Sequence, residues 1–515
     1  MDRLSAVDAS FLYMETPETP MNIGSLTIFA PPPDPSVDVF QSFRDHTVAR
    51  LDLLPSYRRR LQMFPLRLVD PVWILEEELD LDYHLRLADL PQPGTIEQLR
   101  SLVAELHAVP LDRARPLWQY HLIRGVAAGG FAVYVKVHHA AMDGMAGIAA
   151  LPAIYDVSPV PAPVADHPER DPHAVEPPGV VDLIGAAFDD FLSRERRLFG
   201  IGPKLATALA NVGRRAGKTL ALMPEIFRLA PKTLFNVSIS GERSYGTVSV
   251  CLTQVKRIAK ARRVTINDVV MAVCAGALCR YLSARMALPS KPLIAAVPVS
   301  LREPGHTEMT IQVAAVLSSL ATDIADPLQR LAAIARSAHE AKGRLVDIKD
   351  LVSADLSLLG PPLMATGLAW LAGYAHVFDF VPNVMNLWIS NVPGPRQPMY
   401  CAGAPAQHYY PVSIANHGCA LNITAQSYLD NIEFGLTACR LAVPDAQIIA
   451  DDIVLSLEDL ARASAAAEGA GAIEIIEIAT PESVPTAAMS TPRPARKPVR
   501  KSRRAAAQPQ ERPHA

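Results

Sequence analysis

The sequence predicts an α/β protein built from two successive α/β segments. Strand-like and helix-like patterns alternate along residues 1–156 and again from about residue 245, and a proline-dense run at 158–178 separates them. A chain of 515 residues, half of them hydrophobic, is long enough to give each segment its own core. We therefore predict an N-terminal subdomain over residues 1–157, a crossover linker over 158–180, and a helical segment followed by a C-terminal subdomain over 181–465.

Apolar periodicity and turn residues mark the individual elements of both segments. In the first segment we expect strands at 23–29 and 131–138 and helices at 95–107 and 146–155. In the second we expect strands at 247–252, 293–299, 386–390, 420–427 and 433–436, and helices at 267–282, 327–342 and 446–462. Residues 466–515 have too few apolar residues to fold, and we expect a disordered basic tail there.

The charge is divided unevenly along the chain. The formal net charge is −3, yet residues 490–515 carry eight Lys or Arg against one Glu, so the body is acidic. All six cysteines lie between residues 251 and 439 without a C-x-x-C pair, which favours reduced thiols over disulfides or a zinc site. The N-terminus has no basic region followed by an apolar run, so we expect a cytoplasmic protein that is not secreted.

Two stretches are candidates for contact with lipid. The uncharged run at 356–378 is about as long as a membrane span, but Gly360, Pro361 and Pro362 interrupt it, which favours a buried or interfacial helix. Residues 181–234 place Arg and Lys among apolar residues, a pattern typical of a solvated helix face or of a surface that contacts anionic lipid. The basic tail is either a solubilising segment or a second contact with acidic lipid or nucleic acid.

The segment Phe131-Ala-Val-Tyr-Val-Lys-Val-His-His-Ala-Ala-Met-Asp-Gly144 carries the clearest chemical signal. Alternate residues of a strand share a face, so His138 lies with Tyr134 and Lys136, and His139 points with the apolar set if the strand continues. An imidazole with a pKa near ~6.5 and one free ring nitrogen is a competent proton acceptor at neutral pH. A single buried histidine is more often structural, but a doublet followed by Asp143 and Gly144 favours catalysis.

Motifs for several other activities are absent from the sequence. There is no G-x-S-x-G elbow, P-loop, H-E-x-x-H or complete G-x-G-x-x-G. Serine hydrolysis, nucleotide hydrolysis, zinc proteolysis and dinucleotide redox chemistry therefore lack their usual support, and no residue grouping requires a metal.

The histidine segment matches H-H-x-x-x-D-G, a motif shared by CoA- and carrier-dependent acyltransferases. Further blocks occur in a fixed order around it. They are Leu4-Ser-Ala-Val-Asp8, Pro20-Met-Asn-Ile-Gly24, Arg115-Pro-Leu-Trp118, Thr265-Ile-Asn-Asp-Val269, Val297-Pro-Val-Ser-Leu-Arg302, Ser390-Asn-Val-Pro-Gly-Pro395, Leu421-Asn-Ile-Thr424 and Ser427-Tyr428. Over residues 3 to 460 the chain thus resembles the bacterial wax ester synthase/diacylglycerol acyltransferase family.

The resemblance implies a fold and a reaction. It implies two chloramphenicol-acetyltransferase-like subdomains with mixed sheets flanked by helices, and an active-site tunnel at their interface. It also implies transfer of a fatty acyl group from acyl-CoA to the hydroxyl of diacylglycerol or of a long-chain alcohol, without a metal or other cofactor. Both acceptors are lipids, so we expect peripheral association with the inner face of the membrane or with lipid droplets. Oligomeric state and a specific nucleic acid partner are not implied.

The same resemblance suggests site residues. His139 would be the general base, with His138 in a supporting or direct role. Asp143 would be a second acid-base group or a brace for the turn. Asn267 would donate a hydrogen bond to the oxyanion, or it would be a helix N-cap. Substrate-binding positions would be Trp118, beneath the site, Gly144, and Asn391 with Gly394 at a turn near the tunnel.

One block departs from the family pattern. Where the family carries a Gly-Asn pair, this chain has Met309-Thr-Ile-Gln312, which leaves acceptor or acyl contacts there in doubt. Two alternatives stay open: a condensation-type acyltransferase with the same motif, and a catalytically silent lipid-binding or lipid-droplet protein of the same fold.

Overall fold

A computed structural model describes residues 2–63, 70–142, 144–160, 230–300, 313–352, 371, 377–379 and 382–469. Contacts divide the chain into two units, Met1–Ala466 and Ala467–Ala515, and the first unit contains both large sheets. The predicted linker at 158–180, the basic segment at 181–234, the uncharged run at 356–378 and the tail at 466–515 lie mostly outside the described residues. The block at Thr310 and Gln312 lies wholly outside them.

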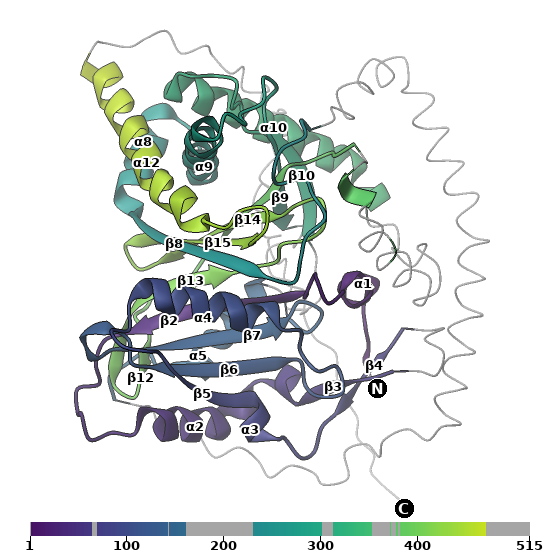
Figure 1. The fold of residues 1–515 in the computed structure, drawn as a ribbon, viewed down its shortest axis with the longest axis vertical. Helices are drawn as coiled ribbons and strands as arrows, with labels where there is room; N and C mark the ends of the chain where they lie inside the picture. The colour runs from purple at the N-terminus through teal and green to yellow at the C-terminus, as the bar shows by residue number, and fades with distance from the viewer. Residues whose placement is uncertain are drawn as a thin grey trace, which may run out of the picture. The chain divides into compact units, whose positions relative to one another are not determined.

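The first large sheet has six strands in the order β12-β13-β2-β7-β6-β5 (Figure 1). They are β2 (Asn22–Phe29), β5 (Leu85–Asp89), β6 (Trp118–Arg124), β7 (Phe131–His138), β12 (Tyr400–Cys401) and β13 (Ala404–Val412). All neighbours are antiparallel except β5 and β6, so the sheet is mixed. A separate small sheet contains β1 (Asp2–Arg3), β3 (Arg59–Gln62) and β4 (Val72–Leu75).

Strand β7 is buried along its whole length, with helices on both faces of its sheet. Val133 and Val135 enter one hydrophobic cluster, to which helices α2 (Val39–Arg50) and α5 (Gly144–Ile154) contribute. Ala132 and Tyr134 enter a second cluster on the opposite face, under helix α4 (Ile96–Ala108). Two shorter helices, α1 (Ala6–Met14) and α3 (Leu81–His84), complete this part. Burial on both faces explains why the strand carries almost no charged residue.

The ends of α4 are fixed by specific polar contacts. Thr95 Oγ1 accepts from the Gln98 N–H at 3.3 Å and Gln98 Oε1 accepts from the Thr95 N–H at 2.7 Å, which forms a capping box. At the other end, Lys136 Nζ donates to the carbonyls of Leu106 and Val109 at 3.0 and 3.1 Å. Burial, and repulsion by Arg86, lower the pKa of Lys136 to about 8. The one lysine of β7 is thus a C-terminal cap for α4.

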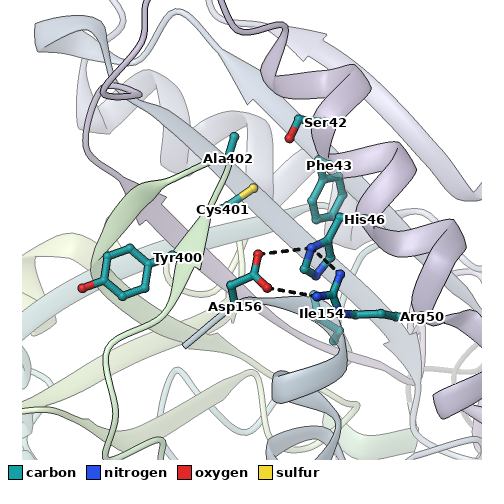
Figure 2. A pocket seen from close by; sticks show the side chains of 9 residues that line it. All are labelled: Ser42, Phe43, His46, Arg50, Ile154, Asp156, Tyr400, Cys401 and Ala402. Carbon is teal, nitrogen blue, oxygen red and sulfur yellow. Dashed lines mark hydrogen bonds and ion pairs between the residues drawn. The ribbon is translucent and has the colours of Figure 1, made fainter. Parts of the chain in front are cut away.

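A polar cluster lies at the C-terminal end of α5. With a rise of 1.5 Å per residue, this end is about 16 Å from Gly144, the first residue of the helix. Asp156 accepts a hydrogen bond from Arg50 Nη2 at 3.1 Å, and its other oxygen lies 3.2 Å from His46 Nδ1. Figure 2 shows these side chains around a cavity of about 190 Å³. Reciprocal backbone hydrogen bonds of 3.0 and 2.8 Å join Asp156 to Tyr400. The cluster therefore anchors the end of α5 to β12.

The second large sheet has six strands in the order β10-β9-β11-β14-β15-β8. They are β8 (Arg243–Cys251), β9 (Ile294–Ser300), β10 (Val313–Ser319), β11 (Leu387–Val392), β14 (Leu421–Tyr428) and β15 (Asn431–Cys439). Strand β11 runs parallel to β9 and β14, while the other pairs are antiparallel. This sheet is therefore also mixed.

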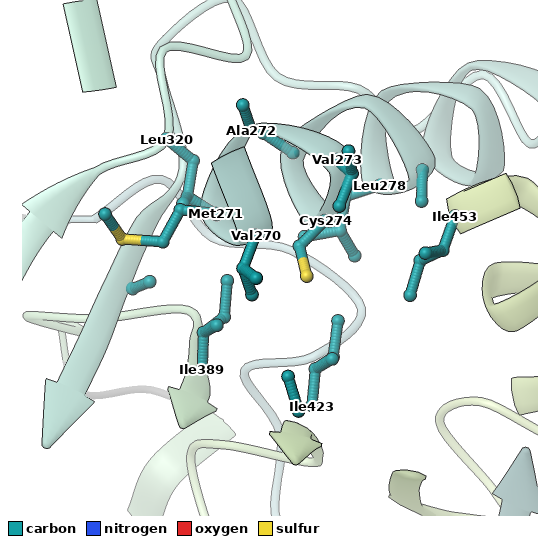
Figure 3. Packing of buried hydrophobic residues seen from close by; sticks show 14 of the residues in the cluster. Val270, Met271, Ala272, Val273, Cys274, Leu278, Leu320, Ile389, Ile423 and Ile453 are labelled. Atoms are coloured by element: carbon teal, nitrogen blue, oxygen red, sulfur yellow. The ribbon is translucent and has the colours of Figure 1, made fainter. Parts of the chain in front are cut away.

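Four helices pack together with the second sheet. They are α8 (Leu252–Arg262), α9 (Ile266–Ala284), α10 (Pro327–Val352) and α12 (Ala446–Gly469). Helix α9 is at the centre of the packing, and Figure 3 shows Val270 and Cys274 directed toward Ile389 and Ile423 of the strands. Among the described residues, α9 is the one helix long and apolar enough to cross a bilayer, and 72% of its apolar window is buried inside the protein.

Strand β13 connects the two large sheets. It comes from the second half of the chain but pairs with β2, from Ala406 opposite Phe29 to Val412 opposite Gly24. Tyr245 of β8 donates a hydrogen bond of 2.9 Å to the Pro411 carbonyl of β13. A Cβ on Gly435 would lie 1.7 Å from the same carbonyl oxygen, so this close approach requires glycine. The predicted boundaries therefore do not divide the sheets, because residues 400–412 belong to the first sheet.

Every predicted element has a counterpart in the structure, but the helices predicted to end at 342 and 462 continue to Val352 and Gly469. Each predicted strand corresponds to β2, β7, β8, β9, β11, β14 or β15, and each predicted helix to α4, α5, α9, α10 or α12. Strands β6, β10 and β13 and helices α1, α2 and α8 are among the elements absent from the prediction. Strand β13 contains Pro405 and Pro411, and proline disfavours a strand with neighbours on both sides.

Three buried histidines make stability depend on pH. Burial, aided by nearby cations, lowers the pKa of His84 to about 4 and the pKa values of His107 and His121 to about 3. His107 is hydrogen-bonded to Tyr134 and to the Ser413 carbonyl, at 2.7 and 2.8 Å. Nε2 of His121 has no hydrogen-bond partner in the described part of the chain. All three histidines are therefore uncharged in the folded protein near neutral pH.

We predict that the free energy of unfolding decreases as the pH falls below 6.5. Below this pH the unfolded chain binds protons on these histidines, whereas the folded chain binds them only at about pH 4 or 3. Each histidine therefore lowers the free energy of unfolding by about 1.4 kcal/mol per pH unit. Denaturant unfolding at pH 7.5, 6.5 and 5.5 measures this slope. His121→Leu should reduce the slope by roughly a quarter to a third. An unchanged slope in that variant would contradict the assignment.

Candidate active site

The histidine doublet lies at the end of β7, where both neighbouring strands hold its backbone. His138 is the last residue of the strand and pairs with Asn22 of β2. Its N–H donates to the Leu117 carbonyl at 3.0 Å, and the N–H of His139 donates to the Met21 carbonyl at 2.8 Å. The chain then turns, with the Ala141 N–H donating to the His138 carbonyl at 2.9 Å. Because the strand ends at His138, its alternation does not extend to His139.

His138 is fully buried, and both of its ring nitrogens face protein groups. The Ala140 N–H donates to Nδ1 at 3.0 Å, so Nδ1 carries the lone pair and Nε2 carries the proton. Nε2 lies 3.4 Å from Oε1 of Glu15. A ring in this arrangement has no lone pair to offer a substrate hydroxyl. The geometry therefore favours a supporting role for His138.

Glu15 is the centre of the charge network behind the doublet. Arg113 donates to its Oε2 from Nε and Nη2 at 2.9 and 2.7 Å, and the Met21 N–H donates to Oε1 at 3.1 Å. Burial raises the pKa of Glu15, but hydrogen bonding and attraction from His138 and Arg113 outweigh burial and lower the pKa from 4.5 to about 2. Glu15 is therefore ionised at every pH near neutrality. Its negative charge orients the Nε2–H of His138.

His139 differs from its neighbour in exposure and in contacts. It is half-buried, and its ring is stacked on Phe11 of α1 with centroids 4.1 Å apart and planes 3° from parallel. Phe11 itself packs against a cluster that contains Leu12, Leu117 and Ala140. Of the two histidines, His139 is thus the one whose ring lies at a partly accessible position.

The short sequence blocks of the first half converge on the doublet. Ser5 caps α1, since its Oγ accepts from the Asp8 N–H at 3.1 Å, and α1 carries Phe11. The block Pro20–Gly24 supplies the Met21 carbonyl, which accepts from the His139 N–H. The block Arg115–Trp118 supplies the Leu117 carbonyl, which accepts from the His138 N–H. The blocks therefore share one structural role, the placement of the end of β7.

The last two residues of the histidine motif are Asp143 and Gly144. Gly144 is the first residue of α5, so a helix begins immediately after the motif. Asp143 lies outside the described residues. Its roles as an acid-base group or as a brace for the turn both stay predictions.

Trp118 is a core residue beneath the doublet. It pairs with Val137, next to His138, and only 1% of its surface is exposed. Its indole N–H donates to the Tyr57 carbonyl at 2.8 Å, and the ring stacks between Tyr57 and His84 at 4.7 and 4.2 Å. These contacts make Trp118 a packing support for β7, and contact with substrate stays a prediction.

Asn267 is the second residue of α9 and does not cap this helix. The N-cap is Thr265, whose Oγ1 accepts from the Asp268 N–H at 3.2 Å, while Asp268 accepts from the Thr265 N–H at 2.8 Å. The N-cap alternative for Asn267 is therefore wrong. Its side chain is half-buried and forms no hydrogen bond within the described part of the chain, so its proposed amide donors are not occupied there.

Asn391 and Gly394 lie at the end of β11, against β14. Asn391 pairs with Ala425, and the Gly394 N–H donates to Ser427 Oγ at 3.0 Å. A Cβ on Gly394 would lie 1.8 Å from the Ser427 carbonyl oxygen, so the position requires glycine. Two sequence blocks 33 residues apart thus meet here. Within the described residues, no hydrogen bond or ion pair joins Asn267, Asn391 or Gly394 to either histidine.

Sequence reasoning missed the residues that surround the doublet. Glu15 and Arg113 are 98 positions apart, and Phe11 and His139 are 128 positions apart, so no local pattern connects them. In the described part of the chain, no group of three or more His, Cys, Asp and Glu side chains is placed to hold a metal ion.

Comparisons with known proteins place this arrangement in a family. Residues 4–270 match the wax ester synthase/diacylglycerol acyltransferase catalytic domain, and residues 312–461 match the C-terminal domain of the same family. A probable diacylglycerol O-acyltransferase of Mycobacterium tuberculosis is 35% identical over 470 residues, which cover 90% of this chain and 99% of that protein.

Solved structures agree with the sequence comparisons. The wax ester synthase/diacylglycerol acyltransferase from Marinobacter aquaeolei VT8 matches with a TM-score of 0.63 and 32% identity, over 90% of this chain and all of that chain. The starter condensation domain of rhizomide synthetase matches with a TM-score of 0.52 and 12% identity, over 90% and 94%, which shows a shared fold alone. The predicted fold and family are therefore confirmed. The chain belongs to the wax ester synthase/diacylglycerol acyltransferase family of acyltransferases.

Proposed function

We propose that this protein transfers a fatty acyl group from acyl-CoA to the hydroxyl of diacylglycerol and so forms triacylglycerol, with a long-chain alcohol as a second acceptor. Family membership and the names of the relatives support this reaction class. The observation that carries the proposal is the unequal pair at the end of β7. His138 is enclosed by the Ala140 amide and Glu15, while His139 is half-buried on Phe11.

In the proposed mechanism, His139 accepts the proton of the acceptor hydroxyl as its oxygen attacks the thioester carbonyl. The carbon–sulfur bond then breaks, and the proton passes from His139 to the departing CoA thiolate. The thioester is already an activated acyl group, so the proposed reaction requires neither a metal nor another cofactor. General-base catalysis of this kind contributes about 10²–10⁴ in rate.

Other residues have proposed supporting roles in this scheme. Asn267, with its amide donors unoccupied in the described part of the chain, is a candidate donor to the oxyanion. Asp143 is a candidate brace for the turn, and Gly144 places the start of α5 beside it. Trp118 and Gly394 stabilise the strands on which the two halves of the site are built, and Asn391 is a candidate contact for the CoA tunnel.

An ester-forming assay tests the reaction and the base. We expect wild-type protein to convert labelled palmitoyl-CoA to triacylglycerol with diacylglycerol, and to wax ester with hexadecanol, and we expect His139→Ala to lower kcat by about 10²–10⁴. His138→Asn is the matched control, because its Oδ1 retains an acceptor for the Ala140 amide, and it should lose less than about tenfold.

Two outcomes would overturn this proposal. If the wild-type protein forms no ester with either acceptor but still binds palmitoyl-CoA, the protein is a lipid-binding member of the fold. Full activity in His139→Ala would remove His139 from the mechanism.

We predict that Glu15→Gln lowers both stability and activity. The variant leaves Arg113 and the Nε2–H of His138 without a carboxylate, which costs about 1–3 kcal/mol. Because the pKa of Glu15 is about 2 in the folded protein and 4.5 for an unperturbed glutamate, its contribution is complete above pH 4.5 and is lost as the pH falls toward 2. Denaturant unfolding of both proteins at pH 7 and pH 3.5 should therefore show a larger difference at pH 7. Glu18→Gln is the control and should change stability by less than about 0.5 kcal/mol.

We also propose that the protein docks peripherally on the inner membrane surface or on lipid droplets, where both acceptors dissolve. Helix α8 supports this proposal, because Lys256, Arg257 and Lys260 are exposed, Arg263 follows at its C-cap, and the helix contains no acidic residue. Each such cation contributes about 1 kcal/mol near an anionic surface. Residues 181–234 and 356–378, mostly outside the described part, are further candidates for this contact.

Vesicle flotation tests the docking surface. We expect the protein to float with vesicles of phosphatidylcholine containing phosphatidylglycerol, and we expect Lys256→Glu/Arg257→Glu/Lys260→Glu to lower the bound fraction about tenfold or more at low salt. Lys291→Glu/Arg336→Glu/Lys342→Glu changes the net charge equally on exposed residues elsewhere and is the control. Equal loss in both variants would show that only net charge matters.

A further inference from the structure

Helix α1 contacts both histidines of the doublet with residues four positions apart. Phe11 stacks on His139, and Glu15, the C-cap residue, faces His138. Residues four apart lie on one face of a helix, so a single face of α1 meets the two adjacent side chains. The helix is itself fixed, since Ser5 caps its first turn and Leu12 is buried against Leu117 and Ala140.

We infer that Phe11 is a positioning residue for His139, which sets the plane of the imidazole and stabilises its protonated form during acyl transfer. This inference rests on the proposed role of His139 as the base. Parallel rings at 4.1 Å fix the plane of the imidazole, because a tilt out of that plane would drive its edge into the phenyl ring. When His139 takes the proton from the acceptor, the imidazolium lies over the negative face of the phenyl ring, and this contact favours the charged form.

In the part of the chain that the structure describes, the charged and titratable groups that contact the doublet come from three elements. Among the described residues, Glu15 at the end of α1 faces His138 of β7, and Arg113 from the segment before β6 pairs with Glu15. A substitution at Phe11 leaves all of these groups in place. Leucine covers the imidazole about as fully as phenylalanine does but has no π face, so Phe11→Leu isolates the aromatic contribution from the effect of burial.

Kinetics of three variants test the inference. We expect Phe11→Leu to lower kcat about 2- to 12-fold and to lower the apparent pKa of the kcat/KM profile by about 0.5, while KM for palmitoyl-CoA stays within about twofold. Phe11→Tyr retains the aromatic face and should restore both values. Phe40→Leu, on a half-buried phenylalanine of α2, should leave the pH profile unchanged.

A second measurement is independent of activity. Diethyl pyrocarbonate modifies unprotonated, accessible histidines, so peptide mass spectrometry across pH yields the pKa of His139, while buried His138 should be protected. We expect the pKa of His139 to fall by about 0.5 in Phe11→Leu but not in Phe11→Tyr. An unchanged pKa and an unchanged pH profile, with KM alone altered, would show that Phe11 only lines the acyl pocket and would overturn the inference. If His139→Ala were active, the proposed base would fail, but this titration would still measure the effect of Phe11.

Discussion

The register of β7 between β2 and β6 is the constraint on which the candidate site depends. Both faces of β7 are buried, so a slip of one residue would exchange the side chains of Tyr134 and Val135 between two different cores. The pairing of Asn22 with His138, and of Trp118 with Val137, is therefore fixed by packing along the whole strand. The strand then ends at one defined residue, and the two adjacent histidines leave it in different environments. The positions of the two histidines are thus set by strand pairing in the sheet and not by the turn that follows.

Two chemically identical side chains acquire different chemistry from these environments. His138 is enclosed, with a backbone amide on one nitrogen and a carboxylate facing the other, so it is part of the scaffold. The carboxylate is itself stabilised by Arg113, which keeps the buried charge balanced. His139 retains partial exposure, and its ring stacks on Phe11. Of the two rings, the half-buried one of His139 is therefore the better placed for the proposed base.

The sequence was sufficient to predict features that depend on local pattern. The strand that ends in the doublet and the helices predicted at 95–107 and 267–282 follow from periodicity, and the structure has them as β7, α4 and α9. The family also followed from short blocks in order. Pairs distant in sequence did not, because Phe11 with His139 and Glu15 with Arg113 are brought together only by tertiary packing. The N-cap of α9 could not be predicted even from local sequence. Thr265 and Asn267 are both good capping residues, and only the backbone path shows that Thr265 is the cap.

The return of β13 to the first sheet has a consequence for synthesis of the chain. Strand β2 is flanked by β7 on one side and by β13 on the other, and β13 ends at residue 412. Until the ribosome has added those residues, β2 presents an unpaired edge with free amide and carbonyl groups beside the strand that carries the doublet. An edge of this kind is a template for pairing with another nascent chain. The edge of β2 therefore stays open to such pairing while more than two hundred residues after the first subdomain are translated. Expression of the two halves as separate chains would leave β12 and β13 on a different chain from the rest of the first sheet.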